Sequence, residues 1–204
     1  MNVLFVHGMG RSPLSGWPLL RELRRNGMNT YSFSYFVCAE TFAEIQSRLE
    51  LQLVDLAKQG DYVLIGHSLG GVLLRAALNA IDTGIAQPKH LFLLGSPISP
   101  SILAQRLSKN VLYKLITNDC GQLLCSFKRM NAIGAVGIPT TCIGGTKSIF
   151  ITKPFFSGQI NDGFVSLTEI SADWFTEDIQ LPLIHSVLPS SRRIARLVVD
   201  AIGR

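Results

Sequence analysis

The 204-residue sequence predicts a protein of the α/β class, in which a mostly parallel sheet is covered by helices on both faces. Two observations carry this prediction. Apolar runs of strand length alternate with stretches of helical period, as in successive β-α-β units. Most of these runs are continuous, which is typical of strands that are buried on both faces. The length fits one domain over residues 1–204.

Six runs are expected to form the sheet, and in chain order they are residues 2–6, 30–35, 62–65, 91–94, 140–143 and 179–183. The helices between them also have local signals. Thr41 and Glu44 form a capping box, after which apolar residues recur on one face until Gly60. A second helix is expected over about 69–84, and a third follows Ser191.

The segment between the fourth and fifth runs is much longer than a crossover helix requires. It predicts extra helices over one edge of the sheet, and we define residues 97–137 as a cap-like or lid-like insert. Its many apolar residues have two interpretations. They form a fixed structural cap, or side chains such as Leu107, Val111 and Leu115 line a pocket at the functional site.

Composition excludes a disordered chain, because 47% of the residues are apolar and 16% are charged. The net charge of +5 is spread along the chain, which favours solvated helix faces and indicates no nucleic-acid partner, although contact with an anionic membrane surface stays open. No secretory signal or membrane span is visible, so we expect a cytoplasmic protein. The cysteines lack metal-ligand spacing. Cys120 and Cys125 are expected as free thiols, with a disulfide between them in an oxidising compartment as the alternative. Nothing in the sequence indicates an oligomeric state.

The strongest local signal is the sequence Gly-His-Ser-Leu-Gly at residues 66–70, directly after a buried strand. A serine is exposed at a sharp strand-to-helix turn only if its neighbours two before and two after lack bulk. Gly66 and Gly70 satisfy this demand. The turn also sets Ser68 at a helix N-terminus, where free N–H groups favour negative charge. We therefore predict Ser68 as a nucleophile.

A serine nucleophile needs a base, and the chain has four histidines. His67 lies beside the serine with its side chain expected to point away, and His90 precedes a strand and so lies at the opposite edge. His7 opens a loop with a different role. His185 follows the last strand, on the same edge as Ser68, and is predicted to be the base.

The base in turn needs a carboxylate that fixes its tautomer. Asp178 precedes a strand and lies at the wrong edge. Asp162 lies in the loop after the fifth strand, in an Asn-Asp-Gly sequence that is also an ordinary turn. With Ser68 and His185 placed, Asp162 is predicted to be the acid, and Glu169 and Asp173 are next in line.

Two backbone N–H groups are expected to bind the oxyanion. One is that of Leu69, the residue after the nucleophile. The other is that of Met9, in the glycine-rich loop after the first strand, where Gly8 and Gly10 allow the main chain to approach the substrate. A phosphate-binding loop is excluded, because the Gly-Lys-Ser/Thr and Gly-x-Gly-x-x-Gly patterns are missing.

These residues together resemble the small bacterial lipases and esterases of the α/β-hydrolase superfamily. Residues 6–10 are similar to the oxyanion loop of that superfamily, and residues 66–71 to its nucleophile turn. The segment 161–166 resembles the one that carries the acid, and His185 stands where the family histidine does. The resemblance covers nearly the whole chain and implies a pared-down α/β-hydrolase fold without the two leading strands.

The predicted function is hydrolysis of a carboxylic ester through an acyl-serine intermediate, as in a carboxylesterase or lipase. The expected substrate is a small-molecule or lipid-like ester, and neither a cofactor nor a metal is expected. The same residues would serve a thioesterase or an acyltransferase, since leaving-group preference depends on pocket shape. From another class, a catalytically silent binding protein on the same fold remains an alternative.

Overall fold

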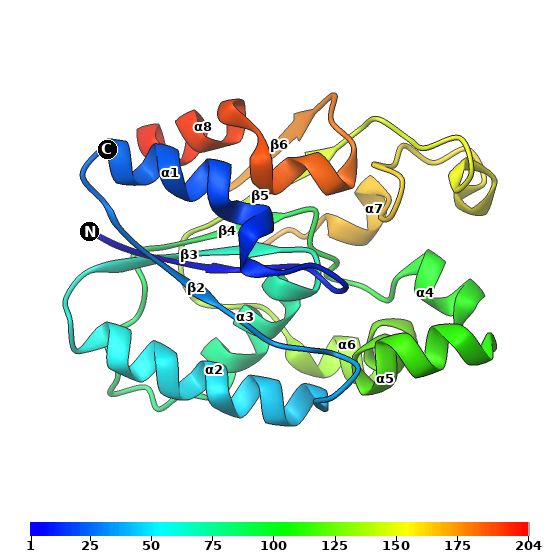
Figure 1. Cartoon of the computed structure of the whole chain (residues 1–204), viewed down its shortest axis with the longest axis horizontal. Helices are drawn as coiled ribbons and strands as arrows, with labels where there is room; N and C mark the ends of the chain where they lie inside the picture. The colour runs from blue at the N-terminus through cyan, green and yellow to red at the C-terminus, as the bar shows by residue number, and fades with distance from the viewer. Residues whose placement is uncertain (204) are drawn as a thin grey trace.

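The computed structural model describes residues 1–203 and contains a six-stranded, all-parallel sheet with the strand order β2-β1-β3-β4-β5-β6 (Figure 1). The strands are β1 (Asn2–Val6), β2 (Asn29–Phe33), β3 (Tyr62–His67), β4 (His90–Leu94), β5 (Thr140–Gly145) and β6 (Glu177–Leu181). This architecture confirms the predicted fold class.

Two strands end earlier than the sequence predicted. β2 stops at Phe33 and not at Tyr35, because its partner β1 ends at Val6, which pairs with Phe33. β6 stops at Leu181, because the N–H of Leu183 donates to the carbonyl of Leu181 at 2.7 Å and closes a tight turn. In both cases the hydrophobic pattern continues beyond the ladder.

Helices cover both faces of the sheet, as Figure 1 shows. Side chains of β1 alternate between two cores: Val3 and Phe5 pack with α1 and α8, whereas Leu4 and Val6 pack with α2 and α3. These helices are α1 (Trp17–Arg25), α2 (Phe42–Ala57), α3 (Leu69–Ala80) and α8 (Arg192–Ile202). The predicted capping box opens α2. The second predicted helix, α3, ends four residues early, because Ile81 is extended and Asp82 begins a turn.

The remaining elements lie in the longer connections. They are the 3-10 helices η1 (Pro13–Gly16), η2 (Lys153–Phe156) and η3 (His185–Ser190), and the short helix α7 (Leu167–Ile170). Among the helices of residues 1–203, none is long and apolar enough to cross a membrane. Cys120 and Cys125 are both free thiols.

The 97–137 segment, called the cap below, forms three helices between β4 and β5. They are α4 (Ile102–Leu107), α5 (Val111–Cys125) and α6 (Phe127–Ile133). A polar residue caps each N-terminus: the side chains of Ser101, Asn110 and Ser126 accept from the third helical N–H. In Figure 1, α4 and α5 extend past the ends of the strands, and α6 lies near α3.

One buried side chain holds the base of the cap. Arg75 of α3 donates to the carbonyl of Pro97, where the cap begins, and to that of Gly134, where its last helix has ended. Its guanidinium also lies 5.6 Å from the ring centroid of Trp174. Burial lowers the pKa of Arg75 to about 10, so the side chain stays charged at neutral pH.

Candidate active site

All strands run in the same direction, so the loops that follow them meet at one edge, called here the carboxyl edge. Ser68 comes directly after β3, and the loop with Met9 follows the neighbouring strand β1. Asp162 and His185 follow β5 and β6. The topology therefore brings the predicted site residues from four loops to one place.

Ser68 forms the apex of a sharp turn between β3 and α3. Its backbone has φ 53° and ψ −123°, a region that residues with side chains rarely adopt. A Cβ added to Gly66 would overlap the main chain at Gly71, and one added to Gly70 would overlap the carbonyl oxygen of Val6. Only glycine fits at either position. These two glycines allow the sharp turn that places Ser68 at the carboxyl edge.

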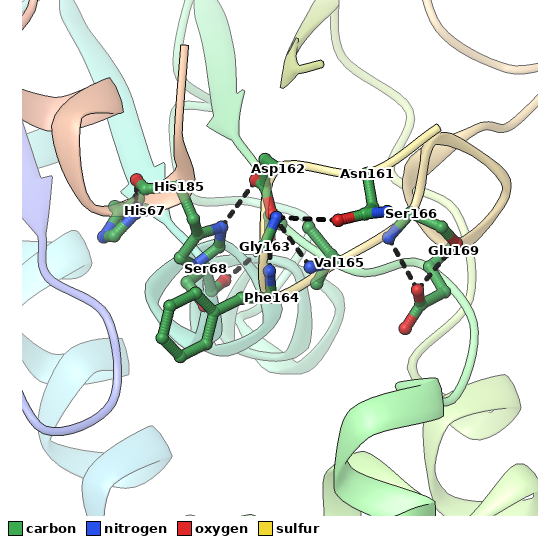
Figure 2. A network of polar contacts seen from close by, with 11 residues as sticks. His67, Ser68, Asn161, Asp162, Gly163, Phe164, Val165, Ser166, Glu169 and His185 are labelled. Carbon is green, nitrogen blue, oxygen red and sulfur yellow. Dashed lines mark hydrogen bonds and ion pairs between the residues drawn. The ribbon is translucent and has the colours of Figure 1, made fainter. Parts of the chain in front are cut away.

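The imidazole of His185 lies between the Asp162 carboxylate and Ser68 in Figure 2. Its Nδ1 donates to Asp162 Oδ2 at 2.7 Å. A carboxylate can only accept, so the proton is on Nδ1, and Nε2 keeps its lone pair. Asp162 is fully buried and His185 is only 6% exposed, so little water competes for this contact. A histidine held in this way is able to accept a proton from a serine hydroxyl.

The loop that carries Asp162 is fixed by its own main chain. Asp162 Oδ1 accepts from the N–H groups of Phe164 and Val165, at 3.0 and 2.9 Å. The backbone carbonyl of Asp162 accepts from the N–H of His185 at 2.9 Å. Acid and histidine are thus joined both by side chains and by backbone, which sets the orientation of the carboxylate with few free torsions.

His67, the last residue of β3, supports His185. The two rings are 4.7 Å apart, and His67 Nε2 donates to the backbone carbonyl of His185 at 3.1 Å. The His67 ring is directed at the main chain of His185. Burial, and then the like charge of a protonated His185, hold the pKa of His67 well below its usual value. A neutral His67 therefore positions His185.

The two residues predicted to bind the oxyanion, Leu69 and Met9, belong to segments close to Ser68. Leu69 is the first residue of α3, and N–H groups in the first turn have no acceptor within a helix. The loop after β1 passes close to the serine, because a Cβ added to Gly8 would lie 3.1 Å from Ser68 Cβ. The hydroxyl of Tyr35 donates to the main chain of this loop at 2.7 Å and holds it in place. Met9, which follows Gly8 in this loop, lines a cavity together with Ser68.

That cavity has a volume of about 270 Å³ and runs from Ser68 to the cap; we call it the Ser68 cavity. Carbon atoms dominate its walls. They belong to Met9, Ser68, Pro97, Ser101, Leu103, Ala104, Leu107, Tyr113, Leu124, Phe164 and Val165. Sites for small molecules usually begin at about 300 Å³, so this cavity fits a short or medium apolar chain.

The sequence placed the wrong residues of α5 at this cavity. Leu107 does line it, but Val111 and Leu115 are 71% and 69% exposed and do not. Tyr113 and Leu124 stand there instead. Successive helical residues are rotated by about 100°, so the inward face depends on how the helix is docked. A break at Asn118, with φ 45°, also offsets the two halves of α5. The spacing of apolar residues in the sequence predicts neither the docking of the helix nor the break at Asn118.

The alternative acids are accounted for differently. Asp173 is exposed. Glu169 is buried, but its carboxylate accepts from the N–H and the hydroxyl of Ser166, both at 2.6 Å, and from the N–H of Ile102 at 2.7 Å. It connects the Asp162 loop to the start of α4, as the right side of Figure 2 shows in part. Within residues 1–203 there is no group of His, Cys, Asp and Glu that could hold a metal ion.

Sequence reasoning missed three other residues that shape the site. A Cβ on Gly95 would lie 3.0 Å from His185 Nδ1 and 3.1 Å from Asp162 Oδ2, and its φ is +53°. A Cβ on Gly145 would lie 2.7 Å from Asp162 Cβ. The hydroxyl of Ser96 donates to the backbone carbonyl of Ser68 at 2.7 Å. The signal available in the sequence was a glycine at or next to the end of a strand, which indicates that another segment packs closely against the main chain there.

Comparisons with known proteins identify the family of the chain. A sequence profile of the alpha/beta hydrolase family matches residues 3–139, and the chain therefore belongs to that family. No functionally curated protein matches the chain by sequence.

Solved structures share the fold at low sequence identity. The mature lipase BlEst2 of Bacillus licheniformis is 18% identical, with a TM-score of 0.80 over 98% of this chain and 91% of that one. A metagenomic carboxyl esterase, MGS0156, is 15% identical, with a TM-score of 0.80 over 98% of this chain and 74% of that one. The thioesterase RedJ of Streptomyces coelicolor is 15% identical, with a TM-score of 0.62 over 99% and 84%. These likenesses show the fold.

Proposed function

We propose that the protein is a serine hydrolase that cleaves carboxylic esters, with Ser68 as nucleophile, His185 as base and Asp162 as the acid that orients the base. One observation carries the proposal: the 2.7 Å hydrogen bond from His185 Nδ1 to a fully buried Asp162, with Ser68 on the other side of the ring (Figure 2). This contact fixes the tautomer in which Nε2 accepts the serine proton.

In the proposed reaction, Ser68 Oγ attacks the ester carbonyl carbon while His185 Nε2 takes the hydroxyl proton. The N–H groups of Met9 and Leu69 bind the oxyanion of the tetrahedral intermediate. His185 then gives the proton to the departing alcohol, which leaves an acyl group on Ser68. Water, deprotonated by the same nitrogen, attacks this acyl-serine and releases the carboxylic acid. The cycle consumes one water and restores every residue.

The Ser68 cavity supports an apolar acyl group as the substrate class. Leu103, Leu107 and Leu124 give it a hydrocarbon wall, and Ser68 lies in its lining. We propose further that residues 1–204 act as one domain, in which the 97–137 cap covers the acyl group. Since burial of one methylene stabilises a complex by about 0.8 kcal/mol, kcat/KM should rise about fourfold per added methylene until the cavity is full.

A thioesterase is the second candidate, because the thioesterase RedJ has the same fold. The proposed site residues are equally suited to a thioester, whose leaving group is a thiol. A panel of octanoyl compounds separates the candidates: an esterase prefers the oxygen esters, whereas a thioesterase prefers octanoyl-CoA. An acyltransferase would instead form a new ester when an alcohol is added.

The proposal is tested with a fluorophosphonate probe, which reacts with activated serines. The wild type should be labelled on Ser68, and Ser68→Ala should lose both labelling and esterase activity while its melting temperature stays the same. Ser12→Ala is the matched control, because it removes a hydroxyl that forms no cap hydrogen bond at the start of η1. Labelling that persists in Ser68→Ala, or that maps to Ser96 or Ser166, would refute the assignment.

A further inference from the structure

A second apolar space lies against the loop that carries Met9. It has a volume of about 450 Å³ and begins at Gly10, one residue beyond Met9. Three segments line it: the loop after β1, residues 35–38 after β2, and Leu115 and Ile116 of α5. We call it the Arg11 hollow, after the charged residue in its wall.

Three large apolar side chains of the Arg11 hollow remain exposed. Phe36, Leu115 and Ile116 are 66%, 69% and 53% exposed, and all three face the same space. A contiguous apolar patch of this kind on a folded protein usually marks a place where something binds. The same α5 helix contributes Tyr113 to the Ser68 cavity, so one helix lines both spaces.

The lining of the hollow carries a positive charge and no negative one. Arg11 is its only charged lining residue, and within residues 1–203 it forms no ion pair. Glu40, the acid of the adjoining loop, is already used, because its carboxylate pairs with Arg48 and accepts from the N–H of Phe36 at 2.7 Å. A guanidinium beside hydrocarbon favours a ligand that carries an anion on an apolar chain.

His7 adds a polar atom to this lining. Its Nδ1 donates to the carbonyl of Gly8 at 2.9 Å, and its ring is stacked on Tyr35 with centroids 4.2 Å apart. The other nitrogen, Nε2, is buried and has no hydrogen-bond partner within residues 1–203. Burial lowers the pKa of His7, so Nε2 is a neutral acceptor. A neutral acceptor cannot donate to an anion, so His7 takes no part in binding one.

The position of the Arg11 hollow indicates which part of a substrate would occupy it. An ester carbon attacked by Ser68 carries two groups, and its oxyanion points to the N–H groups of Met9 and Leu69 in the proposed mechanism. The acyl chain enters the Ser68 cavity, which Met9 lines. The alcohol group must leave in another direction. The hollow shares no lining residue with that cavity, and His7, Gly10 and Arg11 of the same loop line it.

We propose that the Arg11 hollow is a subsite for the alcohol half of the ester substrate, and that this half carries an apolar chain with an anionic group. The inference rests on the ester hydrolysis proposed above and narrows its substrate class to anionic amphiphilic esters. The apolar chain packs on Phe36, Leu115 and Ile116, and the anion binds the guanidinium of Arg11.

Three soluble octanoate esters test the subsite, because they share the acyl group and differ in the alcohol. These are the esters of ethanol, of 10-hydroxydecanamide and of 10-hydroxydecanoate, and each is used below its aggregation concentration. We expect kcat/KM to rise in that order, because the amide adds the chain and the carboxylate adds the anion. The anionic ester should exceed the neutral amide about fivefold, the upper range for a solvent-exposed ion pair.

The ratio of kcat/KM between the anionic and the neutral ester is the decisive quantity, since it is measured on one protein sample and does not depend on the folded fraction. Arg11→Gln should lower this ratio to about one, and Ile116→Asp should lower it below one. Arg193→Gln on α8 is the matched control, because it removes an equal charge away from the hollow and should keep the wild-type ratio. The same ratio in Arg11→Gln as in the wild type overturns the subsite.

The failures of the two proposals are distinguishable. If no octanoate ester is cleaved, the proposed ester hydrolysis is wrong, and the subsite falls with it. If ethyl octanoate is cleaved and the three esters react at equal kcat/KM, ester hydrolysis stands and the Arg11 subsite alone is wrong.

Discussion

The two walls of the Ser68 cavity are held in different ways. The carboxyl edge is fixed by main-chain contacts: the Asp162 carboxylate accepts from two N–H groups of its own loop, and its backbone is bonded to that of His185. The cap is fixed at its base by side chains in addition to main chain: Arg75 donates to the carbonyls of Pro97 and Gly134, and the N–H of Ile98 donates to the carbonyl of Glu169 at 2.7 Å. Its outer helix α5 exposes several large apolar residues.

This difference suggests a division of labour. A reaction that depends on one hydrogen-bond geometry needs a wall with few free torsions, whereas a pocket for hydrocarbon depends mainly on volume and tolerates side-chain movement. Substitutions at the carboxyl edge should therefore change the rate for every ester. Substitutions in the cap should change which ester is preferred.

The largest effect is expected at the carboxyl edge itself. His185→Ala should lower kcat by about 10⁴-fold or more, as losses of a catalytic base do elsewhere. Asp162→Asn should cost about 10³- to 10⁴-fold, because an amide allows the wrong imidazole tautomer and stabilises no positive charge. Steady-state hydrolysis of an aryl octanoate measures both. Asp173→Asn, the same change on an exposed residue, should have no effect. Near-normal activity of Asp162→Asn would place the acid elsewhere.

A pair of glycines separates local strain from contact with the site. Gly95 and Gly134 both have positive φ, at +53° and +68°, so alanine strains the backbone at either position. Only at Gly95 would the new Cβ press on His185 and Asp162; at Gly134 its nearest neighbour would be 3.8 Å away. Gly95→Ala should lower kcat by about 10- to 100-fold, and Gly134→Ala should lower only the melting temperature. Equal kcat values for the two variants would show that the carboxyl edge moves to accommodate the added Cβ without loss of activity, and is therefore no more rigid than the cap.

Local signals in the sequence predicted the fold and also predicted which residues lie at the carboxyl edge. Strand periodicity and the order of elements were sufficient for the sheet, because each depends on neighbours along the chain. The contacts of Gly66, Gly70 and Gly8 likewise follow from sharp turns at strand ends. That Ser68, Asp162 and His185 act together in catalysis stays a prediction.

The cap was predictable only in outline. Helices were expected between residues 97 and 137, but Val111 and Leu115, which one of the two interpretations placed at a pocket, are exposed. The role of Glu169 between Ser166 and Ile102, and that of Arg75 at the base of the cap, depend on residues far apart in sequence. Long-range side-chain contacts of this kind leave no periodic pattern.

A smaller effect is expected in the cap. Ala104 lines the Ser68 cavity and is buried, so Ala104→Phe should fill part of the 270 Å³ and shorten the preferred acyl chain. Octanoyl esters should lose about 10-fold in kcat/KM, whereas acetyl esters should change little. Val111→Trp is the control, because Val111 points to solvent and its replacement should leave the chain-length profile unchanged. A parallel loss for acetyl and octanoyl esters in Ala104→Phe would indicate damage to the reaction and not to the pocket.

The smallest effect concerns stability against acid, and it should arise outside the cap, since none of the four histidines lies within residues 97–137. His67 is buried, and its pKa lies well below the usual 6.5 because burial disfavours the charged form. As the pH falls below 6.5, the unfolded chain binds a proton that folded His67 does not. The free energy of unfolding therefore decreases, by at most about 1.4 kcal/mol per pH unit for one histidine, until the pH reaches the folded pKa.

His67→Gln, whose amide can still donate to the carbonyl of His185, should reduce this dependence of the free energy of unfolding on pH between pH 6.5 and 5, as measured by urea unfolding. Lys109→Gln in the cap is the control and should stay parallel to the wild type, because it removes no histidine. An unchanged slope in His67→Gln would mean that another group, and not the neutral histidine behind His185, makes the protein sensitive to acid.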